Sequence, residues 1–153
     1  WQGVRDADVL GVWSPNAKNA ASAAALARTL DVGQAKAYKS ITDMVADPAI
    51  DVVLTTGGTG FTGRDVTPEA VEPLFEKRLA GFGELFRVLS FEEIGAAAVL
   101  SRATAGTVAG KVVYVMPGSS GAVRLGMQKL ILPELAHVVG QLRRADEPPS
   151  GAR

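Results

Sequence analysis

The sequence predicts an α/β fold built on a mostly parallel sheet. Short apolar segments rich in β-branched residues, such as Ile50 to Thr56, alternate with helical segments such as Ala17 to Leu30. Strands joined by helices pair in parallel through right-handed crossovers. The chain has 153 residues, of which 47% are hydrophobic and 21% charged, and this suits one domain with a sizeable core. A single domain is therefore expected over 1–144, with a flexible tail over 145–153.

The first part of the chain predicts two strands, each followed by a helix. A short buried strand is expected over Ala7 to Trp13, and an alanine-rich helix over Ala17 to Leu30, because alanine has the highest intrinsic helix propensity. A second strand is expected over Gln34 to Lys39. Ser40 then caps a short helix, since serine accepts hydrogen bonds from the first free N–H groups.

A glycine loop follows the third strand, which is expected over Ile50 to Thr56. Four glycines lie in the loop between Gly57 and Gly63, and Thr67-Pro68 supplies an N-cap and a first residue for the next helix. Backbone N–H groups at such a turn attract anions together with the positive end of the helix. Taken alone, the glycines fit a phosphate site and an ordinary tight connection about equally well.

Side chains around this loop favour phosphate. The hydroxyls of Thr55, Thr56 and Thr59 add hydrogen-bond donors, and Arg64 adds a fixed cation. Asp65 is a hard oxygen ligand of the kind that Mg²⁺ prefers. In open parallel sheets ligands bind beyond the carboxyl ends of the strands, where this loop is expected.

The next segment predicts two helices. Apolar residues from Val71 to Leu79 form one face of a helix that Gly81 and Gly83 are expected to end. A second helix is expected over Glu84 to Leu89, and its continuation to Ile94 is left open.

A second loop of the same kind follows a pair of strands. Ala103 to Val108 and Lys111 to Met116 predict two strands joined by a turn, so part of the sheet is expected to be antiparallel. The loop Pro117-Gly118-Ser119-Ser120-Gly121 then opens a helix, and a further helix is expected over 132–142 with a kink at Pro133. This loop fits a second anion site and an ordinary capped helix start about equally well.

Composition excludes several classes of function. Sixteen basic and sixteen acidic residues cancel, so no global charge holds a nucleic acid or an anionic membrane. The chain has no cysteine and one histidine, His137, which excludes thiol nucleophiles and cysteine or histidine metal clusters. No apolar run approaches the roughly 20 residues of a membrane span, and Trp1 to Arg5 does not match a signal sequence. A cytoplasmic protein is expected.

Four motifs within 51–144 resemble one protein family. They are Thr55-Thr56-Gly57-Gly58-Thr59-Gly60 with Arg64-Asp65-Val66-Thr67-Pro68, Gly81-Phe82-Gly83-Glu84 with Ser90-Phe91-Glu92-Glu93-Ile94-Gly95, Leu100-Ser101-Arg102-Ala103, and Pro117-Gly118-Ser119 with Ala122-Val123-Arg124. Together they are similar to the MoaB/Mog family of molybdenum cofactor biosynthesis, the molybdopterin adenylyltransferases. The family fold is a three-layer sandwich with helices on both faces of the sheet.

The resemblance implies a nucleotidyltransferase activity, in which molybdopterin attacks the α-phosphate of Mg-ATP and releases pyrophosphate. It makes Asp65 the catalytic residue and a Mg²⁺ ligand. It also implies a homotrimer or homohexamer, for which an apolar surface over Gly81 to Leu89 is available. Phosphate, nucleotide or pterin binding is implied for Thr56, Gly57, Gly58, Thr59, Gly60, Arg64, Ser101, Pro117, Gly118 and Ser119.

Residues 1 to about 51 resemble a different family. Ala7 to Ser14 and Tyr38 to Val52 are similar to the nucleotide-binding domain of Gfo/Idh/MocA oxidoreductases, entered after its first strand. The glycine motif and the catalytic Glu-Lys-Pro of that family are absent, so nicotinamide chemistry is not expected. Both families supply alternating strands and helices here, which suggests an engineered chimera with a fragment junction near 51–53.

The first part of the chain departs from the MoaB/Mog pattern at its acidic residues. The family carries Ser-Asp where this chain has Ser14-Pro15, and the nearest candidate for a second metal-binding acid is Asp43. One carboxylate holds a hard divalent ion poorly, so adenylyl transfer is expected to be weak or absent. Three hypotheses stay open: a molybdopterin adenylyltransferase, a folded chimera without selected activity, and an oxidoreductase fragment.

Overall fold

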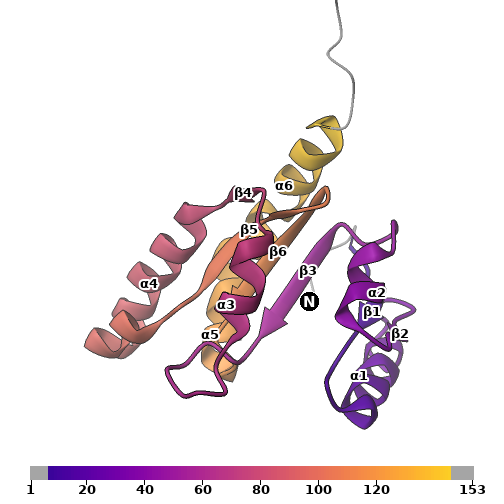
Figure 1. Cartoon of the computed structure of the whole chain (residues 1–153), viewed down its shortest axis with the longest axis horizontal. Coiled ribbons are helices and arrows are strands. Elements are labelled where there is room, and N and C mark those ends of the chain that lie inside the picture. The colour runs from indigo at the N-terminus through magenta and orange to yellow at the C-terminus, as the bar shows by residue number, and fades with distance from the viewer. Residues whose placement is uncertain (1–6, 146–153) are drawn as a thin grey trace, which may run out of the picture. The chain divides into compact units, whose positions relative to one another are not determined.

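The computed structural model describes residues 7–145 and contains two β-sheets (Figure 1). The sheets belong to two units that divide between Ile50 and Asp51. The tail predicted over 145–153 lies outside the described residues except for Ala145, which ends the last helix. Among the described residues, no helix combines the length and the apolarity needed to cross a membrane.

The first unit contains two short strands and two helices. Strand β1 (Gly11–Val12) pairs in parallel with β2 (Lys36–Ala37), so the predicted parallel pairing is confirmed, although each strand is only two residues long. Helix α1 (Ala17–Thr29) buries a row of alanines against these strands. Helix α2 (Ile41–Ala46) begins as predicted, because the Ser40 hydroxyl accepts the N–H of Asp43 at 3.0 Å.

A polar cluster joins the end of β2 to the end of α2. One carboxylate oxygen of Asp47 accepts from Lys36 Nζ at 2.7 Å and from the Tyr38 hydroxyl at 2.6 Å. The other oxygen accepts from the Ala49 N–H at 2.9 Å. Hydrogen bonds to Asp47 and Tyr38 raise the pKa of Lys36 to about 12. This cluster ties the end of β2 to the end of α2 within the first unit.

The second unit contains a four-stranded mixed sheet in the order β3-β6-β5-β4. Strand β3 (Val52–Thr56) is parallel to β6 (Lys111–Met116), whereas β6 is antiparallel to β5 (Thr104–Val108), which is antiparallel to β4 (Lys77–Arg78). The antiparallel strand pair expected from the sequence is therefore present. All six residues of β6 are buried, as expected for the second of four strands.

Helical segments cover both faces of this sheet. On one face, the ring of Phe82 in helix α4 (Ala80–Ile94) contacts the Tyr114 ring edge-on, with centroids 4.9 Å apart. Gly106 pairs with Val113, the neighbour of Tyr114, and so faces the other side. There Phe75 lies so close that a Cβ on Gly106 would be 2.4 Å from its ring. Helix α3 (Thr67–Val71) leads to Phe75 through a 3₁₀ turn, Glu72–Leu74, and the result is three layers.

The prediction of a helix that ends at Gly81 and Gly83 is wrong. Helix α3 ends at Val71, because Pro73 in the next turn has no N–H to continue an α-helix. Both glycines instead lie in the first turn of α4. A Cβ on Gly83 would lie 2.6 Å from the Ala103 carbonyl oxygen, so this glycine allows the helix to approach β5. Helix α4 continues to Ile94 and is followed by a 3₁₀ segment, Gly95–Leu100.

The C-terminal region is helical with one irregular turn. Helix α5 (Ser120–Leu125) is capped by Ser119, and a π-helical turn over Gly126–Ile131 connects it to α6 (Leu132–Ala145). A kink was predicted at Pro133. The irregular turn lies before that residue, since the π-helical turn ends at Ile131 and α6 begins at Leu132. Proline fits the first turn of a helix, where its missing N–H has no partner to lose.

We predict that Gly106→Ala destabilises the protein, because the added methyl group would overlap the Phe75 ring. The expected loss in the free energy of unfolding is about 1 to 3 kcal/mol, the usual range for overpacking. Urea unfolding followed by circular dichroism measures it. The matched control is Gly140→Ala in α6, where a Cβ meets nothing within 4 Å and where alanine is expected to stabilise the helix. Equal effects of the two substitutions would contradict the prediction.

Candidate functional site

The glycine loop begins where β3 ends and is tied to β6. Gly57 and Gly58 have φ angles of +90° and +64°, a region that side chains with a Cβ rarely adopt. The Gly57 N–H donates to the Met116 carbonyl at 2.9 Å. A Cβ on Gly58 would lie 2.2 Å from the Thr67 hydroxyl oxygen, so the chain can fold back closely onto α3. Helix α3 begins at Thr67 itself, one residue earlier than predicted.

The second loop lies directly beside the first. Because β3 and β6 are parallel, both loops leave the same edge of the sheet. A Cβ on Gly118 would lie 3.1 Å from the Cα of Gly57, which shows how closely the two backbones approach. Neither loop amide pair, Gly58 and Thr59 or Gly118 and Ser119, donates its N–H groups to another group of the described chain. We call this region the two-loop corner; it presents backbone donors suited to an anion.

Asp65 points its carboxylate back into the glycine loop. Its Oδ2 accepts from the N–H of Thr62 at 3.0 Å and from the Thr62 hydroxyl at 2.5 Å. These hydrogen bonds from Thr62, the hydroxyl first, hold the pKa of Asp65 below its usual value, and the N–H of Gly60 and the charge of Arg102 act in the same direction. Asp65 is therefore ionised at neutral pH and already holds the loop together.

Arg102 is the cation that the loop contacts. Its Nε donates to the Thr59 carbonyl at 3.0 Å, and its Nη2 donates to the carbonyls of Gly60 at 2.6 Å and Asp65 at 2.8 Å. An ion pair joins it to Glu69. Arg102 was not among the residues to which the sequence assigned a role in the site. The signal was available, because Arg102 lies in the motif Leu100-Ser101-Arg102-Ala103.

The other predicted site residues take varied positions. Thr56 and Arg64 are exposed at the loop. The Ser119 hydroxyl caps α5 by accepting the Ala122 N–H at 3.2 Å. The Ser101 hydroxyl accepts the Ala103 N–H at 3.4 Å, which places it beside Arg102.

Two carboxylates lie near this loop, those of Asp65 and Glu69, and Glu69 is already paired with Arg102. The residues from 7 to 145 contain no group of three or more histidine, cysteine or acidic side chains that could hold a metal ion. Asp43 is exposed on α2 of the first unit. Asp65 still fits one role, since Mg²⁺ is often bound by one or two carboxylates with water and substrate phosphate completing the shell.

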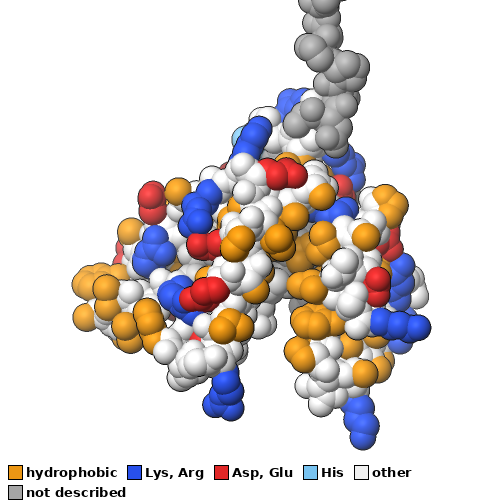
Figure 2. All heavy atoms as spheres, viewed as in Figure 1, with side chains coloured by type: hydrophobic (Ala, Val, Ile, Leu, Met, Phe, Trp, Pro, Cys, Tyr) orange, Lys and Arg blue, Asp and Glu red, His pale blue; other side chains and the backbone are white. Residues whose placement is uncertain are grey.

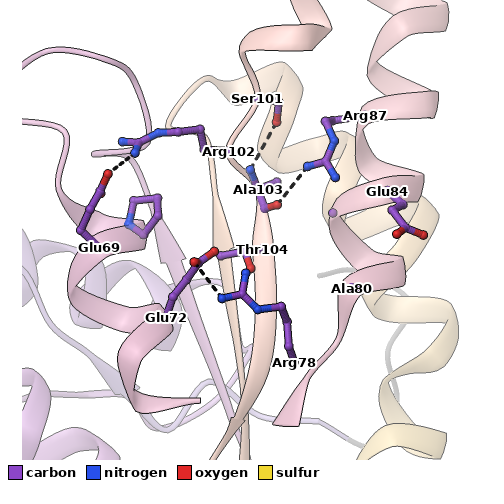
Figure 3. Close-up of a pocket in the computed structure, with 12 residues that line it drawn as sticks. Glu69, Glu72, Arg78, Ala80, Glu84, Arg87, Ser101, Arg102, Ala103 and Thr104 are labelled. Atoms are coloured by element: carbon purple, nitrogen blue, oxygen red, sulfur yellow. Dashed lines mark hydrogen bonds and ion pairs between the residues drawn. The ribbon is translucent and has the colours of Figure 1, made fainter. Parts of the chain in front are cut away.

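A hollow of about 430 Å³ lies beside Arg102, between α3 and α4 (Figure 3). Figure 3 shows Arg102 directed towards Glu69 and Arg78 towards Glu72, with Arg78 Nη2 at 2.9 Å from the carboxylate. Arginine and glutamate are equally numerous in its wall, so charge there is balanced. The charged lining residues are Glu69, Glu72, Glu84, Arg78, Arg87 and Arg102. This hollow was not among the sites predicted from the sequence.

Comparison with known families gives one match over most of the chain. The family model described as "Probable molybdopterin binding domain" matches residues 24–137. The match begins upstream of the junction suspected near 51–53. No comparison supports a Gfo/Idh/MocA fragment or a chimera.

Curated relatives share one description. The molybdenum cofactor biosynthesis protein B of Bacillus cereus is 64% identical over 96 residues, which are 62% of this chain and 57% of that protein. The protein of the same name from Bacillus subtilis is 60% identical over 99 residues, 64% of this chain and 58% of that protein. The chain thus spans less than two thirds of the length of these relatives.

Solved structures of similar proteins confirm the α/β fold class. A crystal structure of a molybdenum cofactor biosynthesis protein B has a TM-score of 0.71 and 43% identity, covering 94% of this chain and 99% of that chain. The tungsten cofactor synthesizing protein MoaB from Pyrococcus furiosus has a TM-score of 0.65 and 34% identity, covering 90% and 98%.

We predict that Thr62→Val raises the pKa of Asp65 towards its ordinary value of about 3.9, because the substitution removes the hydroxyl that contributes most to the lowered pKa. The ionised carboxylate stabilises the folded loop above about pH 4, and this contribution is lost as the pH falls through the lowered pKa. The variant should therefore lose its loop contacts at a higher pH. An NMR titration of the Asp65 carboxyl carbon measures the shift. Thr56→Val is the control, and an unchanged Asp65 pKa in Thr62→Val would contradict the prediction.

Proposed function

The chain belongs to the probable molybdopterin binding domain family, and from this premise we propose that it transfers the adenylyl group of Mg-ATP to molybdopterin during molybdenum cofactor biosynthesis. The observation that carries the proposal is the two-loop corner, where the backbones at Gly57 and Gly118 meet at one edge of the sheet. The description shared by the Bacillus relatives supports the pathway. Molybdopterin and ATP are both anionic, and the corner offers donors to both.

In this reaction a phosphate oxygen of molybdopterin forms a bond to the α-phosphorus of ATP, and the bond to the pyrophosphate oxygen breaks. The protein contributes by holding the two anions in line and by stabilising the charge that develops. In the first loop, the N–H groups of Gly58 and Thr59 would donate to phosphate oxygens of one reactant. In the second loop, the N–H groups of Gly118 and Ser119 would donate to the other reactant, so each reactant meets a set of fixed dipoles.

Asp65 is the residue of this chain that would hold Mg²⁺. The ion supplies positive charge beside the phosphates when it is bound. Asp65 Oδ2 is engaged by Thr62, so Oδ1 is the oxygen that would bind the ion. Arg64 is exposed at the same loop and would add a cation that can reach a phosphate without displacing a contact.

The test incubates the protein with molybdopterin and Mg-ATP and measures pyrophosphate release together with the adenylylated pterin. Slow turnover is expected, since one carboxylate of this unit serves the metal. Asp65→Asn should lower the rate on the order of a hundredfold, the range for removing one charged or polar group that stabilises a transition state. Asp51→Asn is the matched control, because Asp51 lies at the opposite end of β3 from the glycine loop and pairs with Arg143 at 2.9 Å. Turnover at a normal family rate would contradict the expected slowness, and no transfer at all would contradict the function.

We also propose that the protein assembles as a homotrimer, or as a hexamer of two trimers, through α4 and the 3₁₀ segment after it. Leu85, Val88, Phe91 and Ile94 are each more than half exposed and recur every third residue on α4. Figure 2 shows hydrophobic side chains gathered over the end of α4. Residues three apart adjoin on a helix, so these side chains form a stripe that winds around α4 rather than one face. Exposed apolar side chains of this number favour burial against another protein surface.

Oligomer mass tests this assembly. Sedimentation or light scattering of the unaltered chain should give three or six times the mass of one chain. Phe91→Lys should shift the mass towards that of a single chain, because it would place a charge in the proposed contact. Leu74→Lys is the control, since Leu74 is similarly exposed but lies in the 3₁₀ turn after α3. A single-chain mass for the unaltered protein would refute the assembly.

A further inference from the structure

Arg102 reaches the glycine loop from a distant part of the chain. It lies between the 3₁₀ segment Gly95–Leu100 and strand β5, 37 to 43 residues after the loop residues that it contacts. Its side chain is 23% exposed. The guanidinium joins Thr59 and Gly60 at the first half of the loop to Asp65 at the end of it. One guanidinium group therefore connects both ends of the segment from Thr59 to Asp65.

The donors of Arg102 are mostly used by the protein itself. A guanidinium has five N–H donors in a fixed plane. Three of them bind the loop carbonyls, and an Nη1 hydrogen faces Glu69. The exposed ring of Phe61 lies over the same group, 5.3 Å from Cζ to the ring centroid. Arg102 is thus poorly placed to bind a substrate phosphate directly.

Its contacts determine where the loop amides point. In a trans peptide the N–H points away from the C=O of the same unit, so binding the Thr59 carbonyl orients the Gly60 N–H. A Cβ on Gly60 would lie 2.8 Å from Asp65 Oδ2, which shows how closely the Gly60 backbone approaches that carboxylate. Arg102 therefore holds the peptide units on both sides of Gly60, the residue against which the Asp65 carboxylate lies.

We propose that Arg102 is the positioning residue of the anion site: by binding the carbonyls of Thr59, Gly60 and Asp65 it holds the chain between Thr59, whose N–H is a donor of the two-loop corner, and the Asp65 carboxylate. This inference rests on the proposed function for the identity of the anion, but its statement about the loop does not. The planar guanidinium is essential to this positioning role, because it must donate to three carbonyls from two parts of the loop at once. A point charge such as lysine cannot meet them equally well.

The experiment compares the unaltered protein with Arg102→Ala and Arg102→Lys. Hydrogen exchange of the amides in 57–66 is measured without ligand, and inorganic pyrophosphate binding is measured by calorimetry with Mg²⁺ present. Arg102→Ala should exchange faster in this segment and bind pyrophosphate about tenfold more weakly, the effect expected from losing charge-assisted hydrogen bonds. Methylguanidinium added to Arg102→Ala should recover part of the pyrophosphate binding. The Arg102→Lys variant should bind pyrophosphate more weakly than the unaltered protein.

Two matched variants separate positioning from general stability. Glu69→Gln removes the charge of the ion pair but not the loop contacts. Arg87→Ala removes an arginine of the same hollow, whose Nη1 donates to the Ala103 carbonyl at 3.5 Å. Both should keep loop exchange and pyrophosphate affinity near those of the unaltered protein. If either variant reproduced the Arg102→Ala result, the proposal would be overturned.

The outcomes also separate this inference from the proposed function. Unchanged loop exchange in Arg102→Ala, or full recovery by lysine, would overturn the positioning role. If Arg102→Ala does not fold, Arg102→Lys carries the test: faster loop exchange with weaker binding supports the role, and unaltered values overturn it. If the unaltered chain does not bind pyrophosphate, the proposed function fails, while loop exchange still decides whether Arg102 positions the loop.

Discussion

Parallel pairing between β3 and β6 is the constraint on which the candidate site depends. The strands are in register from Val52 with Val112 to Thr56 with Met116, and the Gly57 N–H extends the ladder by one hydrogen bond. Both loops therefore leave the sheet at the same level. A slip of one residue would turn the side chains of β3 to the opposite face and would separate Gly57 from Gly118. The position of the corner is thus determined by the sheet, and the loops determine only its donors.

Charge at the corner is balanced before any ligand binds. The Asp65 carboxylate uses donors of its own loop at Thr62, and the Arg102 guanidinium is matched by carbonyl oxygens and by Glu69. The chain as a whole carries no formal net charge at pH 7. Attraction for an anion therefore has to come from oriented N–H groups and from Arg64, which are local and short in range. This arrangement favours a ligand that fits both loops over a nonspecific anion.

Much of the second unit could be predicted from its sequence, because its signals are local. The glycine loop, the strand pair 103–116 and the helix start after the loop 117–121 each follow from neighbouring residues, and the structure contains all three. The errors arose where distant contacts decide. Gly83 suggested a helix end, yet it lies within α4, and the reason for a glycine there is the Ala103 carbonyl just before β5, which leaves no room for a Cβ. The role of Arg102 was missed for the same reason, since its partners lie 33 to 43 residues away.

The reversal of chain direction at β5 explains how Arg102 reaches the corner at all. Strands β3 and β6 run in the same direction and end at the corner, so any residue that follows them is near it. Strand β5 is antiparallel to β6 and pairs Thr104 with Val115, which places its beginning, rather than its end, at that edge. Arg102 immediately precedes this beginning. Had β5 been parallel, the same residue would lie at the opposite edge of the sheet, so the antiparallel strand supplies the corner with a cation that a fully parallel sheet would place elsewhere.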